Sequence, residues 1–186
     1  ADRVKCGQLD FTDEAAVKAF FESIPQGEYN GLVITACGRA PHGPFLDLET
    51  SKVRELFDQK FFGPYHCAKY GGPRLQDGGC IVFCSGVLCR RPGVNCSPLS
   101  AVNGAVEGLT RALALELGPR LRFNCLSPGF VDTERFDHLP AEKKQKMMAS
   151  TAASLPLQRC GDKDDIGHAV HFLLANAYTT GITLDA

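Results

Sequence analysis

The sequence has no tryptophan, only two methionines and no long hydrophobic run. A transmembrane helix needs about 20 consecutive apolar residues, so we expect neither a membrane-spanning segment nor a signal-peptide core. It also lacks an extended run of lysine and arginine, and its formal net charge is −1. Nucleic-acid-binding proteins carry basic patches, so a nucleic-acid partner is not expected.

No Cys-x-x-Cys pair occurs, although the sequence contains nine cysteines. An odd number of cysteines does not suit a disulfide framework, and most of these cysteines lie within apolar stretches. We therefore interpret them as reduced, mostly buried thiols of a cytoplasmic protein. His168 and His171 lie one helical turn apart, but no third ligand is near them in the sequence, so no metal site is expected.

What the sequence does contain is an alternation of strand-like and helix-like segments over 186 residues. That length suits a single domain, residues 1–186. The alternation implies an α/β protein with a doubly wound parallel sheet. We predict strands at 4–9, 31–35, 79–84, the start of 121–129, and 181–186. Helices are predicted after a Thr12 cap, at 50–70, at 100–117, at 141–150, and after an Asp162 cap.

The helix at 100–117 is apolar on two sides, because large and small side chains each recur at i+3 and i+4 spacing. One side suits the sheet, and the other allows a second helix to approach closely. We therefore expect a homodimer or homotetramer built on the helices at 50–70 and 99–117. Glu107, Arg111 and Glu116 are the residues of this helix that we expect to face water. The small side chains are those of Ala101, Ala105, Gly108 and Ala112.

Four segments in order resemble the short-chain dehydrogenase/reductase family: "GLVITACG" at 31–38, "GGCIVFCSG" at 78–86, "EGLTRALALELGP" at 107–119 and "NCLSPGFVDT" at 124–133. The resemblance covers essentially the whole chain. It implies a Rossmann-type fold and hydride transfer between NAD or NADP and a carbonyl or alcohol. The sequence does not choose between the two cofactors, and it does not identify the small-molecule substrate.

The resemblance also shows a departure at the catalytic positions. The family's tyrosine acid/base falls on Leu99, its lysine on Asn103, its serine on Gly86 and its asparagine on Lys60. Leucine cannot transfer a proton, so the usual acid is absent. Ser85, Ser97, Ser100 and Lys60 are candidate substitutes, with Ser85 and Lys60 the first choices. The alternatives are that Ser85 only shapes a turn and that Lys60 is a solvated helix lysine.

Cofactor-binding positions are partly preserved in the resemblance. An aspartate follows the first predicted strand, a small-residue turn follows the second, and a Pro-Gly turn follows the fourth. The alternatives are a helix-cap partner for the aspartate and an ordinary strand-to-loop turn for the Pro-Gly segment. Arg90 and Arg91 lie in the loop before the helix at 100–117. We expect them either to bind an acidic substrate or a cofactor phosphate, or to be solvated. The expected cofactor-binding residues are Asp10, Ala36, Gly38, Pro128, Gly129, Val131 and Thr133.

The family's Gly-rich phosphate turn does not occur in this sequence. The resemblance begins near the family's third strand, so we expect a Rossmann-type sheet without its first two strands. We expect either a sequence that is incomplete relative to the working protein or disorder of those segments. Two functions fit: an NAD(P)-dependent oxidoreductase with a non-standard proton relay, or a catalytically inactive relative that binds a dinucleotide or serves as an oligomeric interaction protein.

Overall fold

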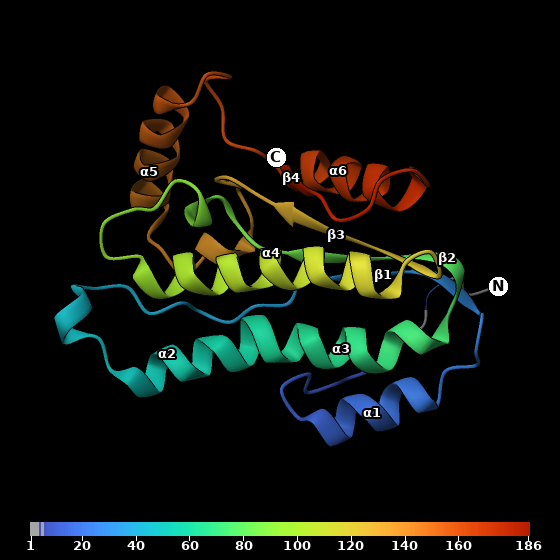
Figure 1. The fold of residues 1–186 in the computed structure, drawn as a ribbon. Coiled ribbons are helices and arrows are strands. Elements are labelled where there is room, and N and C mark those ends of the chain that lie inside the picture. Colours follow the sequence, from blue (N-terminus) through green and yellow to red (C-terminus); the bar gives the residue numbers. More distant parts are fainter. Residues whose placement is uncertain (1–3, 5) are drawn as a thin grey trace.

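The computed structural model describes residue 4 and residues 6–186 of the chain. Four strands form one parallel sheet in the order β1-β2-β3-β4 (Figure 1). A parallel pair needs a crossover connection between its strands, usually a helix, and each pair here has one. The predicted α/β parallel sheet is therefore confirmed. Its strands are β1 (Tyr29–Ile34), β2 (Leu75–Cys84), β3 (Leu121–Ser127) and β4 (Thr183–Asp185).

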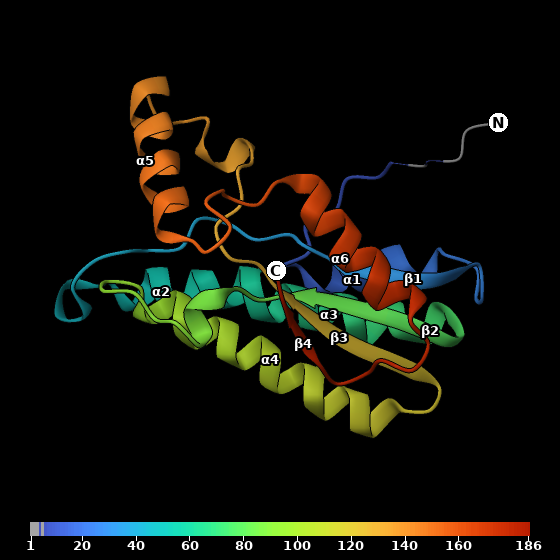
Figure 2. The same cartoon turned by 90° about the horizontal axis from the view of Figure 1, so that it is seen from above.

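Helices cover both faces of the sheet (Figure 2). The helix α6 (Lys163–Ala175) packs on one face, and α3 (Gly63–Gly71) and α4 (Ser97–Leu117) pack on the other. Side chains of β2 alternate between the two faces, as the two-residue period of a strand requires. Ile81 and Phe83 belong to the α3 and α4 side of the core, whereas Val82 packs with Leu173 of α6. The sheet is thus doubly wound.

The helix predicted at 50–70 is one helical run with an irregular centre. It consists of α2 (Thr50–Phe57), the π-helical turn η2 (Asp58–Phe62) and α3. The helix α4 starts three residues earlier than predicted, because Pro98 is well suited to the first helical turn. The helix α1 (Glu14–Glu22) packs against α3, and α5 (Ala141–Ser154) extends away from the sheet. No helix in the described part of the chain is long and apolar enough to cross a membrane.

The prediction of a strand at 4–9 is wrong for Val4 and residues 6–9, which adopt no regular secondary structure. Lys5 lies outside the described residues. A strand needs a hydrogen-bonding partner, and β1 pairs only with β2 within the described chain. The segment therefore has no neighbouring strand. Leu9 still packs against the hydrophobic core, so the apolar pattern marked burial rather than a strand.

The cap of α1 differs by one residue from the prediction. Asp13, not Thr12, accepts hydrogen bonds from two backbone N–H groups of the first turn. Thr12 instead donates both its backbone N–H and its hydroxyl to Asp10. The predicted cap at Asp162 is confirmed, and with Asp165 it forms a reciprocal capping box at the start of α6.

Candidate functional site

A pocket of about 540 Å³ lies just beyond the C-terminal end of β1. Ligands of open α/β sheets bind at the carboxyl ends of the strands. The pocket brings together three of the predicted cofactor-binding residues, Asp10, Ala36 and Gly38. The other lining residues are Phe11, Thr12, Cys37 and Gln59.

Two features of this pocket suit a polar ligand. A Cβ atom at Gly38 would lie 1.6 Å from Oε1 of Gln59, so a larger residue at 38 would force the Gln59 side chain to move. Asp10 accepts hydrogen bonds from the hydroxyl of Thr12 at 2.6 Å and from its N–H at 3.0 Å. The hydroxyl bond is the main cause that lowers the pKa of Asp10. Asp10 is therefore a carboxylate at neutral pH, able to accept a hydrogen bond from a ligand.

The remaining predicted cofactor-binding residues lie in the turn after β3, apart from those lining the pocket. The N–H of Val87 donates to the carbonyl of Pro128 at 3.0 Å, which holds this turn beside the loop that follows Gly86. Gly129 donates to the carbonyl of Ala186, and Val131 forms a bridge with Gly161. The predicted residues thus form two groups, one at the end of β1 and one beside the end of β2.

The π turn η2 stands between these groups. Gln59 lines the pocket, and the next residue, Lys60, reaches the end of β2. Lys60 is only 7% exposed, and its Nζ donates to the carbonyl oxygens of Cys84 at 3.3 Å and Ser85 at 3.1 Å. The interpretation of Lys60 as a solvated lysine is therefore wrong. π turns inside α-helices are frequent at functional sites.

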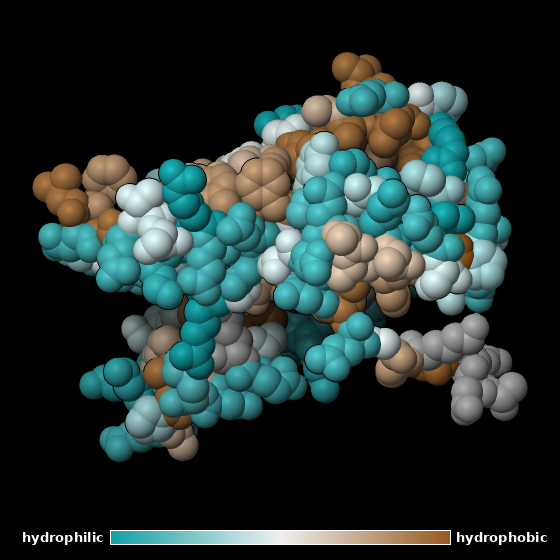
Figure 3. Space-filling view, turned by 90° about the horizontal axis from the view of Figure 1, so that it is seen from below, coloured by the Kyte–Doolittle hydropathy of each residue, from teal (hydrophilic) through white to brown (hydrophobic). Residues whose placement is uncertain are grey.

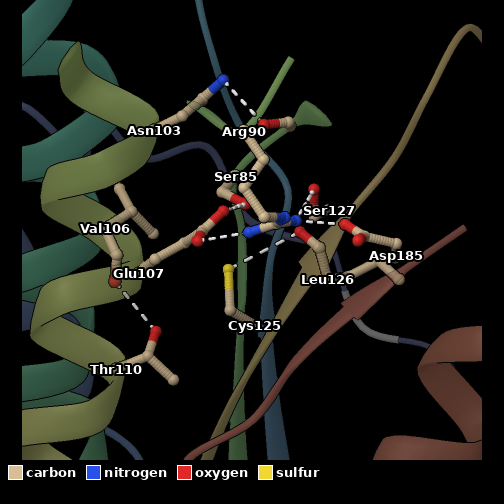
Figure 4. Close-up of polar contacts among 11 residues, drawn as sticks. Ser85, Arg90, Asn103, Val106, Glu107, Thr110, Cys125, Leu126, Ser127 and Asp185 are labelled. Carbon is tan, nitrogen blue, oxygen red and sulfur yellow. Dashed lines mark hydrogen bonds and ion pairs between the residues drawn. The ribbon is translucent and has the colours of Figure 1, made fainter. Parts of the chain in front are cut away.

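A residue of α4, Asn103, contacts the same turn at the end of β2. Asn103 is 1% exposed, and its Nδ2 donates to the carbonyl of Gly86 at 3.2 Å (Figure 4). Its Oδ1 is buried with no partner among the described residues. Leu99 lies one helical turn earlier and is half-buried. Lys60, Gly86 and Asn103 therefore converge on the turn that ends β2.

A buried ionic network lies beside this turn, and the sequence reasoning missed it. Glu107 was expected to face water, yet it is 5% exposed and accepts a hydrogen bond from the hydroxyl of Ser85 at 2.9 Å. Arg90 donates to the second carboxylate oxygen of Glu107, to Ser127 Oγ at 2.7 Å and to Asp185 (Figure 4). Arg90 is therefore held by ion pairs within the protein, although its side chain is 37% exposed.

The hydrogen bond to Asp185 is the main cause that raises the pKa of Arg90, and Glu107 adds to it. Arg90 thereby ties α4 to the ends of β3 and β4. A signal for this network was present in the sequence. Asn103, Glu107 and Thr110 follow i+4 and i+3 spacing and form a polar line along a helix that is otherwise apolar.

Comparison with known proteins supports an oxidoreductase ancestry. The family model described as enoyl-(acyl carrier protein) reductase matches residues 2–186. An uncharacterised oxidoreductase, YxbG of Bacillus subtilis, is 30% identical, and the match covers 96% of this chain and 69% of that protein. A 3-oxoacyl-[acyl-carrier-protein] reductase of Mus musculus is 35% identical over 59% of this chain and 44% of that protein.

The solved structure of a small-chain dehydrogenase in complex with NADPH superposes with a TM-score of 0.91. It is 36% identical, and the match covers 96% of this chain and 80% of that chain. Together, the doubly wound sheet and the polar residues at its strand ends define a Rossmann-like protein. The chain belongs to the short-chain dehydrogenase/reductase family, whose members are NAD(P)-dependent oxidoreductases.

Proposed function

We propose that this chain acts as an NAD(P)-dependent oxidoreductase on a carbonyl or alcohol substrate through a non-standard proton relay. The observation that carries the proposal is the convergence of Lys60, Gly86 and Asn103 at the end of β2. By resemblance, these are three of the four positions that match the family's catalytic groups, although none of them keeps the family's residue. NAD or NADP, when bound, supplies the hydride chemistry.

The residues present fit part of a dinucleotide. A volume of about 540 Å³ lies within the usual range for a small-molecule pocket. The Asp10 carboxylate can accept a hydrogen bond there. Gly38 has no side chain, so a ligand can approach the backbone at that position. We propose that this pocket holds one end of the cofactor and that Pro128, Gly129, Val131 and Thr133 hold the nicotinamide end beside Gly86. The described residues include no Gly-rich phosphate turn.

The relay must work without an acid at Leu99. A positioned general acid contributes roughly 10²–10⁴-fold in rate. Ser85 and Lys60 are the candidate substitutes. The hydroxyl proton of Ser85 is directed at the buried Glu107, whereas Lys60 has three N–H donors and uses two on carbonyl oxygens. Lys60 therefore keeps a donor for a ligand oxygen.

Calorimetric titration with NADPH and NADH, followed by a panel of carbonyl substrates, tests this function. We expect the full-length protein to bind at least one dinucleotide and to reduce at least one carbonyl compound, whereas residues 1–186 alone should bind a dinucleotide weakly or not at all, because they include no Gly-rich phosphate turn. Binding without turnover across the panel would instead support the inactive, dinucleotide-binding alternative. Absence of both would overturn the proposed function.

We also propose that the protein is a homodimer or homotetramer that assembles through α4 and the α2–α3 run. Ala101 and Ala112 of α4 are exposed, and Ala105 and Gly108 are half-buried. Apolar side chains gather along the edge of the molecule that α4 forms (Figure 3), where Leu115 is 87% exposed. All nine cysteines are free thiols, which supports the proposal of a cytoplasmic location.

A further inference from the structure

The cation at the end of β2 comes from η2 and not from α4. Lys60 is 7% exposed, and no carboxylate of the described chain lies within ion-pair distance of its Nζ. A buried ammonium group without a counter-charge is costly unless hydrogen bonds or a ligand compensate it. Two carbonyl oxygens provide part of that compensation.

A second observation places the charge of Lys60 at the end of β2. Burial raises the pKa of the Cys84 thiol, and the charge of Lys60 opposes that rise. The ammonium group therefore acts on the same residues that Asn103 approaches from α4. Asn103 contributes no charge, and its Oδ1 is buried without a partner among residues 4 and 6–186. A buried acceptor without a partner is costly.

We infer that Lys60 supplies the buried cation at the end of β2 and that Asn103, at the position matching the family's lysine, contributes no charge. Lys60 donates its remaining N–H to the ligand oxygen that gains negative charge, whereas Arg90, the other cation beside this turn, is paired with Glu107 and Asp185. Asn103 is a positioning residue that holds the carbonyl of Gly86. This inference rests on the proposed function, and the ligand it implies is a carbonyl compound whose oxygen points toward the end of β2.

We expect this turn to tolerate only one ammonium group. Lys60 donates a hydrogen bond to the carbonyl of Ser85, and Asn103 donates one to the carbonyl of the next residue, Gly86. Lysines at both 60 and 103 would therefore bring two buried like charges close together. Like charges repel strongly in a region that water does not screen. A lysine at 103 is therefore expected to be harmful when Lys60 is present and tolerated when Lys60 is absent.

A double-mutant cycle at positions 60 and 103 tests whether the two positions share one charge, and it requires no enzymatic activity. We expect Asn103→Lys to lower Tm by at least about 4 °C, the effect of roughly 1 kcal/mol or more in a chain of this size. In the Lys60→Asn background, the same change should cost less than half of that shift. Equal shifts in the two backgrounds would contradict the inference. A fold check by circular dichroism accompanies each variant.

Turnover provides the second arm of the test. Lys60→Asn should reduce carbonyl reduction by about 100-fold, and the double variant Lys60→Asn/Asn103→Lys should recover most of that loss. The matched control is Lys52→Asn, because Lys52 is exposed on α2 and contacts only Glu55. If the double variant recovers stability but not turnover, Lys60 is structural and the inference is wrong. If no variant and no wild-type protein reduces any carbonyl, the proposed function fails, while the stability cycle still decides whether the two positions share one charge.

Discussion

At the residue scale, two buried charged side chains, Lys60 and Glu107, both contact Ser85, and only Glu107 has an ion-pair partner among the described residues. Lys60 donates to the backbone carbonyl of Ser85, and Glu107 accepts from its hydroxyl. Glu107 also has a charged partner, because Arg90 reaches it from the loop before α4. The side chain of Glu107 is 6% exposed and that of Arg90 is 37% exposed. The pair is therefore only partly screened by water.

Arg90→Met should lower the free energy of unfolding by roughly 1–3 kcal/mol. Breaking a fully buried pair costs about 3–5 kcal/mol, and the partial exposure of Arg90 reduces that value. Urea denaturation measures the loss. The control is Arg91→Met, which removes the exposed neighbouring arginine and should change stability by less than about 0.5 kcal/mol. Equal effects of the two changes would show that Glu107 does not depend on Arg90.

Two buried thiols predict a loss of stability at high pH. Burial raises the pKa of Cys67 and of Cys125 from 9.0 to about 11. Between pH 9 and 11 the unfolded chain therefore loses these protons while the folded chain keeps them, so the free energy of unfolding falls as pH rises. The two thiols together should cost roughly 2–5 kcal/mol by pH 11.

Denaturation curves at pH 8, 9, 10 and 11 check this prediction. Lysines and tyrosines also titrate in this range, so the informative comparison is with Cys125→Ala. That variant should lose part of the pH dependence between pH 9 and 11. An identical pH dependence in both proteins would mean that Cys125 does not contribute.

At the element scale, the sequence predicted what local chemistry determines and missed what a partner determines. The cap at Asp162 follows from side-chain chemistry within four residues, and the structure confirms it. The strand at 4–9 depends on a neighbouring strand, which the described chain does not provide. The π turn left no clear pattern in the sequence, yet it directs Lys60 to the end of β2.

The same contrast applies to the candidate site. Asp10, Ala36 and Gly38 follow predicted strands, so their meeting in one pocket could be anticipated from the parallel sheet. The burial of Glu107 was harder to anticipate, because a glutamate on a helix is usually solvated, and the polar line that it forms with Asn103 and Thr110 was the signal for it. Only the tertiary contact with Arg90 and Ser85 makes that burial tolerable.

The capping box gives an element-scale prediction. Asp162→Ala should lower the free energy of unfolding by about 1 kcal/mol, the usual value of an N-cap side chain, because Asp162 accepts from the N–H groups of Asp164 and Asp165 at 2.9 Å each. Thermal denaturation measures the effect. Asp164→Ala is the matched control, since Asp164 lies in the same first turn but makes no cap. A loss as large for the control would attribute the effect to helix-dipole charge alone.

At the scale of the whole molecule, the exposed face of α4 predicts self-association. No atom lies within 4 Å of the position that a Cβ atom would take at Gly108, so Gly108→Arg should leave the single chain folded while blocking the approach of a second helix. Light scattering at tens of micromolar should give two or four times 20.1 kDa for the wild-type protein and 20.1 kDa for the variant. A single-chain mass for the wild-type protein would contradict the assembly.

The central claim is that this chain keeps an oxidoreductase site in which the missing proton donor at position 99 limits the rate. The most direct measurement is carbonyl-dependent oxidation of NADPH by Leu99→Tyr, with Leu99→Phe as the control that adds the ring without the hydroxyl. Leu99 is half-buried and lies one helical turn before Asn103, so a phenol there would face the end of β2.

The account predicts that Leu99→Tyr raises the rate by about 100-fold, the low end of what a general acid contributes, whereas Leu99→Phe stays at the wild-type rate. The same low rate for all three proteins, with NADPH bound, would show that the site has lost more than its acid. A wild-type rate already equal to that of Leu99→Tyr would show that the substitute donor fully replaces the tyrosine and that Leu99 does not limit the reaction.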